Sequence, residues 1–452
     1  MTIERARPTL DDTDRNGVVT RGNLADGREI AFYDDTPQQR QLPAGDHPPV
    51  AERVTSELRR DRMLDEWVVI AAHRQSRTHL PAAADCPLCP TLPDGPPTEV
   101  PAADYDVVVF ENRFPALAGA LGSPAGAGLF DGRAEVDRLA ARPGSGRCEV
   151  VCFSSAHSRS YGSLPKQRLR TLGAAWADRI RELSRHPAVE HVLVFENRGQ
   201  EIGVTLDHPH GQIYGYPFVP PYTRRHLEVA GAHRARTGRC LVCDLSAEAE
   251  AGCRLIAATE HALAYVPMAA RWPYEAHVVP RTHVPDLAAL DDDQRDDLVI
   301  LSGRVAHAFD QLFDGLTPYI AAWQGAPTRT QGRDDLHLHQ QIFTVRRAEQ
   351  KLKHLAGSES AAGVFVNDIV PETAAQRLRA AMHRPDRARN QRGDTLQSDQ
   401  EGSSVPRSLD RCDLRPTASR PGVTHRDFPA PTSLRGDAHQ IADDNPRKWR
   451  RP

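Results

Sequence analysis

His208-Pro209-His210-Gly211-Gln212 opens an apolar, β-like run that continues from Gln212 to Val219. Alternate residues of a strand point to the same face, so both imidazoles are expected to look into one site. Pro209 restricts its own φ and favours an extended conformation for His208. Such a pair can divide its roles, with one ring binding a metal ion and the other attacking an electrophile. Two solvated loop histidines are the alternative for an isolated pair, and the surrounding sequence argues against it.

The sequence elements around this pair recur along the chain. The first set comprises Cys86-x-x-Cys89, a strand at 149–153 ending near His157, a helix at 165–185, a strand at 191–195 and the pair itself. The second set comprises Cys240-x-x-Cys243, a strand at 277–280 ending near His283, a helix at 291–313, a strand at 319–323 and His337-Leu338-His339, followed by a strand at 340–345. His157 precedes His208 by 51 positions, and His283 precedes His337 by 54. This order and spacing predict two tandem copies of one α+β unit.

Composition and charge exclude several classes of protein. The chain has 452 residues, 39% of them hydrophobic, and a formal net charge of −3, so no nucleic-acid partner is expected. No apolar run approaches the ~20 residues of a membrane span, and the N-terminus lacks a signal-peptide stretch, so we expect a cytoplasmic protein. We divide the chain into a polar, partly disordered arm at 1–55, a catalytic half at 56–225, a second half at 226–385 and a disordered tail at 386–452.

Each unit carries the ligand set of a tetrahedral zinc site. Cys86, Cys89, His157 and His208 supply two thiolates and two imidazoles, and Cys240, Cys243, His283 and His337 supply the same set in the second half. Because protein ligands fill all four positions, both sites are predicted to be structural. For Cys240 and Cys243 the alternative is a pair of buried thiols without metal.

His210 is then the free histidine of the first pair. A neutral imidazole is a good nucleophile at phosphorus, provided that its other nitrogen donates to an acceptor, which the sequence does not identify. Gln212 shares a strand face with His210, and its amide can bond a phosphoryl oxygen as charge builds there. In the second half, His339 is followed by Gln340 and Gln341, and we interpret this copy as degenerate.

Several donors are suited to an anionic ligand. Arg74 and Arg77 lie three residues apart after an apolar strand and could clamp a diphosphate. The string Phe-Glu-Asn-Arg occurs twice after apolar runs and delivers Asn112 and Asn197 to strand ends. Gly203 would allow a close backbone approach to a ligand. A solvated arginine pair is the alternative for Arg74 and Arg77.

Together these motifs resemble the galactose-1-phosphate uridylyltransferases of the histidine-triad superfamily, over residues 60 to 380. The similarity includes Cys86-x-x-Cys89, the stretches at 109–113, 152–158 and 195–199, His208 to Ile213, Trp272-Pro273-Tyr274-Glu275 and 336–339. The resemblance implies two histidine-triad-like units, each an antiparallel sheet with flanking helices. It also implies that His210 carries a uridylyl group covalently, that Gln212 binds the transferred phosphoryl group, and that the enzyme is a homodimer with shared active sites.

The resemblance further implies the positions that contact substrate. These are Arg74, Arg77, Phe110, Asn112, Asn197, Gly203 and Thr205 for the nucleotide or sugar phosphate, with Lys353 and Glu359 reaching the substrate of the other subunit. Some members have an iron site with a histidine before Gly-Ala-Pro. Here Gln324 takes that place, while Cys240 and Cys243 are present, so we predict zinc, as in relatives that act on ADP-glucose.

The expected reaction converts UDP-glucose and galactose 1-phosphate into UDP-galactose and glucose 1-phosphate by double displacement at His210. The alternatives are an ADP-glucose or dinucleoside-polyphosphate phosphorylase, a hydrolase, and a zinc-stabilised nucleotide-sensing protein without turnover. Comparing UDP-glucose, ADP-glucose and diadenosine tetraphosphate as donors distinguishes the phosphorylases, and a hydrolase is distinguished by whether water or a sugar phosphate accepts the nucleotidyl group. An intact His210 with Gln212 argues against a protein without turnover.

Overall fold

The structure is a computed structural model that describes residues 19–38, 40, 55–76, 80–92, 95–118 and 141–384. The tail predicted at 386–452, most of the N-terminal arm predicted at 1–55, and Arg77 lie outside these residues.

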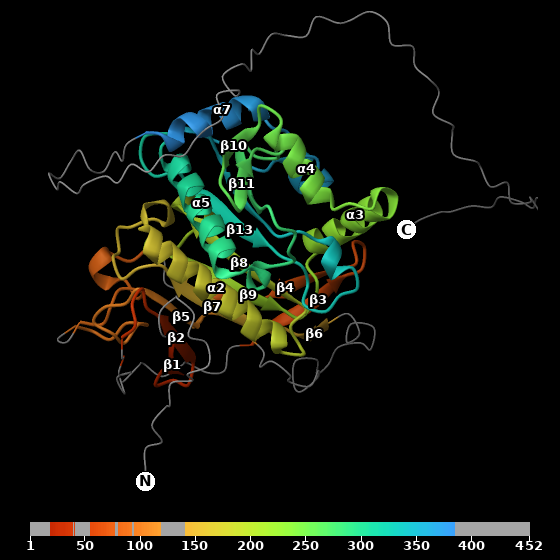
Figure 1. Cartoon of the computed structure of the whole chain (residues 1–452). Coiled ribbons are helices and arrows are strands. Elements are labelled where there is room, and N and C mark those ends of the chain that lie inside the picture. Colours follow the sequence, from red (N-terminus) through yellow and green to blue (C-terminus); the bar gives the residue numbers. More distant parts are fainter. Residues whose placement is uncertain are drawn as a thin grey trace, which may run out of the picture. The chain divides into compact units, whose positions relative to one another are not determined.

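Eleven strands of the described chain form one sheet in which every neighbouring pair is antiparallel (Figure 1). In spatial order they are β1 (Val19–Asn23), β2 (Glu29–Tyr33), β5 (Val107–Glu111), β7 (Arg147–Cys152), β9 (His210–Tyr216), β8 (His191–Arg198), β13 (Tyr319–Gln324), β14 (His339–Thr344), β12 (Tyr274–Pro280), β11 (Ala262–Tyr265) and β10 (Leu255–Ala258). Strands β8 and β13 join the two halves, with Phe195 opposite Ala322.

The two halves repeat the same connection between strands. In the first, β7 is followed by α2 (Lys166–Arg185), β8 and β9, and in the second, β12 is followed by α5 (Asp292–Asp310), β13 and β14. The spatial orders β7-β9-β8 and β13-β14-β12 are related by reversal about the central strands. Helices α2 and α5 lie side by side on one face of the sheet (Figure 1). The predicted α+β fold of two tandem units, each an antiparallel sheet with flanking helices, is confirmed.

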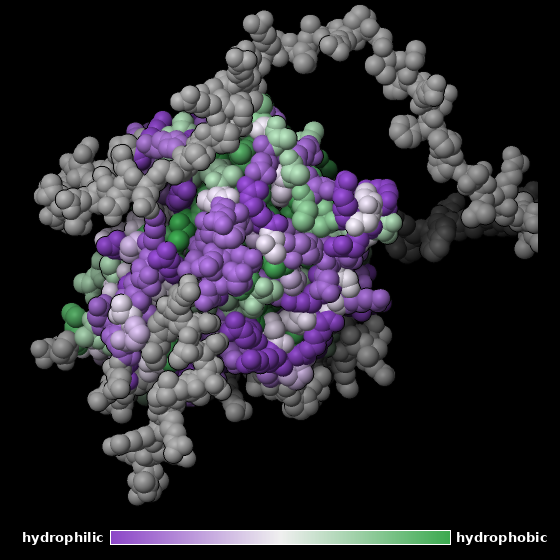
Figure 2. All heavy atoms as spheres, viewed as in Figure 1, coloured by the Kyte–Doolittle hydropathy of each residue, from purple (hydrophilic) through white to green (hydrophobic). Residues whose placement is uncertain are grey.

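The apolar stripes of α2 and α5 are buried against each other and the sheet. Leu172 and Trp176 of α2 and Leu301 of α5 are at most 4% exposed, and burial of each such side chain contributes about 1.5–3 kcal/mol. Gly303 allows the helices to approach, since a Cβ there would lie 2.8 Å from Leu169 Cδ1. The outward side of α2 is mostly hydrophilic (Figure 2), as its periodicity requires.

The opposite face of the large sheet is covered in part by a second, smaller sheet. In the first half, β3 (Glu57–Asp61), β4 (Glu66–Ile70) and β6 (Ala141–Pro143) form a small sheet whose Leu58 packs with Tyr214 of β9. Ile213 points the other way, into the core with α2. Helix α2 therefore covers one face of strand β9, and the small sheet covers the other. The site described below lies on the face of the small sheet.

The second half and the C-terminal segment complete this arrangement. Their remaining elements are α3 (Pro221–Thr237), α4 (Leu241–Glu250), β15 (Arg346–Ala348), β16 (Lys351–Leu352), α6 (Gly357–Ala362) and α7 (Pro371–Met382). Within the described ranges, no helix combines the length and the apolar character needed to cross a membrane.

In the stretch predicted as a polar arm, residues 19–33 contribute β1 and β2, and Phe32 is 1% exposed.

His191, at the start of β8, is a fully buried histidine outside the predicted site. Its ring stacks on Tyr216 with centroids 6.5 Å apart. Neither ring nitrogen has a hydrogen-bond partner among the described residues. Burial lowers the pKa of His191 from 6.5 to about 4, because the charged form is poorly solvated there.

This burial makes the stability of the protein depend on pH. Below pH 6.5 His191 binds a proton in the unfolded chain, whereas in the folded chain it stays neutral until the pH falls to about 4. The free energy of unfolding should therefore fall as the pH drops through that window, by up to roughly 3 kcal/mol from this group. We expect His191→Phe, which keeps an aromatic ring on Tyr216, to flatten this fall in urea unfolding curves. The exposed His383 offers a control, and His383→Gln should follow the wild type. Equal slopes for wild type and His191→Phe would contradict the assignment.

Candidate active site

The first histidine pair is divided between two neighbouring environments. His208 precedes β9 and is 1% exposed, whereas His210 begins β9 and lines an open cavity. The turn between Cys86 and Cys89 contributes Pro87 and Leu88 to the wall of the same cavity. The predicted division of roles therefore has a geometric basis, because one short segment of chain serves both places.

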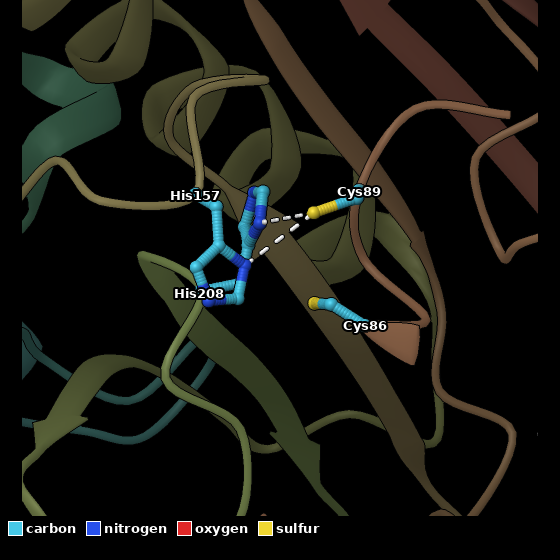
Figure 3. A group of neighbouring side chains, drawn as sticks. All are labelled: Cys86, Cys89, His157 and His208. Carbon is cyan, nitrogen blue, oxygen red and sulfur yellow. Dashed lines mark hydrogen bonds between the residues drawn. The ribbon is translucent and has the colours of Figure 1, made fainter. Parts of the chain in front are cut away.

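Cys86, Cys89, His157 and His208 converge as predicted (Figure 3). Their ligand atoms all lie within 4.8 Å of one another. Cys89 Sγ is 3.4 Å from His157 Nδ1 and 3.5 Å from His208 Nδ1. Two soft thiols and two imidazoles at this separation fit a tetrahedral transition-metal ion.

The second ring nitrogen of His208 is held by its surroundings. Nε2 lies 2.8 Å from the carbonyl oxygen of Ser154 and 2.8 Å from the hydroxyl of Tyr105, which itself donates to Leu88 O. Donation to Ser154 O leaves the lone pair on Nδ1, facing the thiols. Burial lowers the pKa of His208 to about 4, so the ring is neutral, as a metal ligand must be.

The thiols support the same interpretation. Burial of the thiol, and to a smaller extent the neighbouring Cys86, raises the pKa of Cys89 to about 12. Two thiolates are therefore not stable here without a cation. A divalent ion reverses that preference because it stabilises the thiolate directly. The side chains present therefore fit a bound metal ion better than a pair of free thiols.

The second predicted cluster has the same design. Cys240, Cys243, His283 and His337 place their ligand atoms within 4.8 Å of one another. His337 Nδ1 lies 3.3 Å from Cys243 Sγ, and its Nε2 lies 2.9 Å from Pro280 O. His283 Nε2 lies 2.9 Å from Asp334 O, while its buried Nδ1 has no hydrogen-bond partner within the described chain. That orphaned atom fits a metal ligand.

His210 has the tautomer that a nucleophile needs. Nδ1 lies 2.7 Å from the carbonyl oxygen of His208 and donates to it, so the lone pair resides on Nε2. Burial lowers the pKa of His210, and the bond to His208 O opposes this only in part. A neutral ring with a free Nε2 can attack an electrophilic phosphorus. The acceptor that the sequence could not identify is thus the backbone of the other histidine.

The cavity in front of β9 has a volume of about 340 Å³. It brings together six of the predicted residues: Arg74, Phe110, Asn112, Thr205, His210 and Gln212. They come from the helical turn after β4, from β5 and the residue that follows it, from the loop before β9 and from β9 itself. This size and mixed lining suit a small polar ligand with an aromatic group.

Other predicted contacts do not line this cavity. Asn197 lies in β8, and Gly203 ends the short helical turn that follows it, with a φ of +83°. Lys353 and Glu359 bond to each other, with Nζ to Oε1 at 2.7 Å, and Lys353 also donates to Val366 O. The placement of Arg77 lies outside the described residues.

Two charged residues of the wall were missed by sequence reasoning. Glu99 and Arg113 line the cavity and contact each other at 3.4 Å, and Glu99 also binds Arg28 at 2.6 Å. Arg113 ends the first Phe-Glu-Asn-Arg string, which could have signalled it. Nothing near Glu99 in the sequence marks that residue, because its role depends on a distant arginine.

The second histidine pair lies in a closed environment. His339 Nδ1 is 3.3 Å from His337 O, as in the first pair. Its ring is 4% exposed and packs between His226 and His277, with centroids 5.4 and 5.2 Å away. The amide of Gln341, the counterpart of Gln212, donates to Glu275 at 2.8 Å. The groups that face a cavity in the first half are therefore enclosed in the second.

Comparisons with known proteins agree with this geometry. Residues 45–220 match the N-terminal domain of galactose-1-phosphate uridyl transferase, and residues 222–390 match its C-terminal domain. The chain is 41% identical to a galactose-1-phosphate uridylyltransferase of Streptomyces lividans, over 80% of this chain and 97% of that protein. It is 25% identical to an ADP-glucose phosphorylase of Arabidopsis thaliana, over 73% and 93%. A solved uridylyltransferase structure superposes with a TM-score of 0.60 and 30% identity, covering 72% of this chain and 98% of that one. This chain belongs to the galactose-1-phosphate uridylyltransferase family.

Proposed function

We propose that this protein transfers UMP from UDP-glucose to galactose 1-phosphate through a uridylyl group on His210. The observation that carries the proposal is the neutral His210, whose Nε2 is left free by the bond from Nδ1 to His208 O, at a cavity that it shares with Gln212. Membership of the family and the name of the Streptomyces lividans relative support the substrates.

The reaction follows from these groups in two displacements. Nε2 of His210 attacks the α-phosphorus of UDP-glucose, the bond from that phosphorus to the bridging oxygen breaks, and glucose 1-phosphate leaves with the electron pair. Galactose 1-phosphate then attacks the same phosphorus and His210 leaves as a neutral ring. Gln212 donates its amide hydrogens to the phosphoryl oxygens, where negative charge builds in each transition state.

The wall of the cavity suits a nucleoside diphosphate sugar. Arg74 and Arg113 place positive charge beside a ligand that carries two phosphates, and Phe110 offers an aromatic face. The half at 56–225 contains all these groups, and we assign the reaction to it. The half at 226–385, with its enclosed His339, serves as structural support.

We propose zinc at both cysteine and histidine clusters. Their sulfur and nitrogen ligands suit this ion, and protein ligands fill all four positions, which is typical of structural sites. Cys86, Cys89, His157 and His208 would hold one ion and fix the strand end that presents His210. Cys240, Cys243, His283 and His337 would hold the other.

An ADP-glucose phosphorylase is the second candidate. The match to the Arabidopsis thaliana protein supports it, and so does the resemblance, which implies a second zinc site in relatives that act on ADP-glucose. The two candidates share His210 and Gln212 and differ in the base that they accept and in whether galactose 1-phosphate or inorganic phosphate takes the nucleotidyl group.

Incubation with UDP-glucose alone should leave a UMP adduct on His210, detectable by mass spectrometry of the intact protein and its peptides. His210→Ala should abolish the adduct and lower transfer by about 10⁴-fold or more, because the nucleophile is lost. His383→Gln, far along the chain and exposed, is the control. A wild-type enzyme without any adduct, or a His210→Ala enzyme with near-normal turnover, would contradict the proposal. A stronger adduct from ADP-glucose than from UDP-glucose would favour the second candidate.

Metal analysis of the purified protein should give two zinc ions per chain. Cys89→Ser and Cys243→Ser should each remove one ion and lower the free energy of unfolding by several kcal/mol, since structural zinc stabilises the folded state. Only Cys89→Ser should also strongly impair adduct formation, because its cluster holds His208. Cys148→Ser replaces a buried thiol outside both clusters and should retain two ions. Unchanged zinc in Cys89→Ser would exclude the first site.

We also propose a homodimer with shared active sites. The resemblance places Lys353 and Glu359 near the substrate of the other subunit, and in agreement with it neither residue lines the cavity of its own chain, where they pair with each other. Mixing inactive Lys353→Ala and His210→Ala subunits should restore about one quarter of wild-type activity, because half of the dimers form one intact site. Each variant alone is the control, and no recovery after subunit exchange would contradict shared sites.

A further inference from the structure

Tyr214 is a polar residue beside the proposed reaction centre that the mechanism above leaves without a role. It lies two residues after Gln212 in β9 and therefore points to the same face of the sheet. Its ring packs edge-on against Phe195, with centroids 5.1 Å apart, and against Tyr216 at 5.8 Å. The residue is 8% exposed, so the position of its hydroxyl is set by packing.

The hydroxyl of Tyr214 lies within a directed chain of hydrogen bonds. Arg74 Nη1 donates to the tyrosine oxygen at 3.2 Å, and the hydroxyl donates to Gln212 Oε1 at 3.1 Å. A guanidinium group can only donate, so the tyrosine oxygen must accept in the first bond. The hydroxyl hydrogen is directed to the amide oxygen, and the bond from Arg74 favours this direction by occupying a lone pair of the tyrosine oxygen.

This direction decides which end of the Gln212 amide is available to a ligand. An amide can rotate by half a turn and exchange its oxygen and nitrogen with little steric change. With Oε1 held by the hydroxyl, Nε2 is the end left to donate to a phosphoryl oxygen. In the opposite orientation Oε1 would face the phosphate, where two acceptors repel each other.

We propose that Tyr214 is a positioning residue for nucleotidyl transfer, whose hydroxyl holds the Gln212 amide with its donors toward the transferred phosphoryl group. This assignment rests on the proposed function and adds a residue to it. Arg74 then contributes in two ways, as a positive charge in the cavity wall and as the donor that orients the hydroxyl.

Tyr214→Phe tests this role, since it removes one oxygen and keeps the ring in contact with Phe195. The loss of a preorganised donor to a developing charge should slow formation of the UMP adduct in single-turnover experiments by roughly 10- to 100-fold. The KM for UDP-glucose should change much less, because the ground state depends on the cavity as a whole. The melting temperature should stay close to that of the wild type.

A double-mutant cycle separates positioning from general packing. In a Gln212→Ala background there is no amide to orient, so Tyr214→Phe should alter the adduct rate by less than about twofold. Tyr216→Phe is the matched control, a neighbouring tyrosine on the same strand face, and should leave the rate near the wild-type value.

Three results would overturn the assignment. They are an unchanged adduct rate in Tyr214→Phe, an equal loss in the wild-type and Gln212→Ala backgrounds, or a loss confined to KM. Absence of any adduct from the wild-type enzyme would overturn the proposed function and this assignment with it, whereas an adduct that Tyr214→Phe leaves unaffected would overturn only the role of Tyr214.

Discussion

The hydrogen bond from His210 Nδ1 to the carbonyl oxygen of His208 is the interaction on which the site depends. It links two histidines of opposite tautomer, because His208 carries its proton on Nε2 and His210 carries its proton on Nδ1. His208 is held through Nε2 by Ser154 O and turns Nδ1 to the thiols, while its backbone carbonyl selects the tautomer of His210. A metal ion bound by His208 would thereby also fix the acceptor for the proposed nucleophile. The proposed structural and reactive roles would be joined by one short backbone segment, and Pro209, with its restricted backbone, suits the position between them.

The two copies of the repeat differ in the surroundings of the second histidine of each pair. Both halves keep the cysteine pair, the strand-end histidine and the bond from the second histidine to the carbonyl of the first. The difference lies around the ring. His210 lines a cavity, whereas His339 is enclosed by His226 and His277, and Gln341 is occupied by Glu275. Ligand pattern alone therefore does not make a catalytic site, because an accessible ring and an uncommitted amide are also needed.

Much of the fold could be anticipated from the sequence, since it depends on short-range periodicity. The helix predicted at 165–185 is observed as Lys166–Arg185, and the strand predicted at 191–195 extends to Arg198. The helix predicted at 291–313 ends at Asp310, although Leu312 and Phe313 remain buried, because an apolar stripe continues after the helical backbone stops. Residues 19–33 were assigned to a polar arm, and their place at the edge of the large sheet was not anticipated. Strand pairing over such a distance along the chain leaves little local signal.

The sequence by itself determined the chemistry available to this protein: two clusters of soft ligands, a histidine outside both clusters, and a glutamine on the same strand face. These depend on spacing along one or two strands, which alternation controls. Only the tertiary structure decided that His208 O accepts from His210, that Glu99 and Arg113 share the cavity wall, that Lys353 binds Glu359, and that Arg74 reaches Tyr214 across 140 positions of the chain. The physical reason is that a hydrogen bond requires its two atoms to be about 3 Å apart, and for residues from distant segments that separation is set by sheet register and packing.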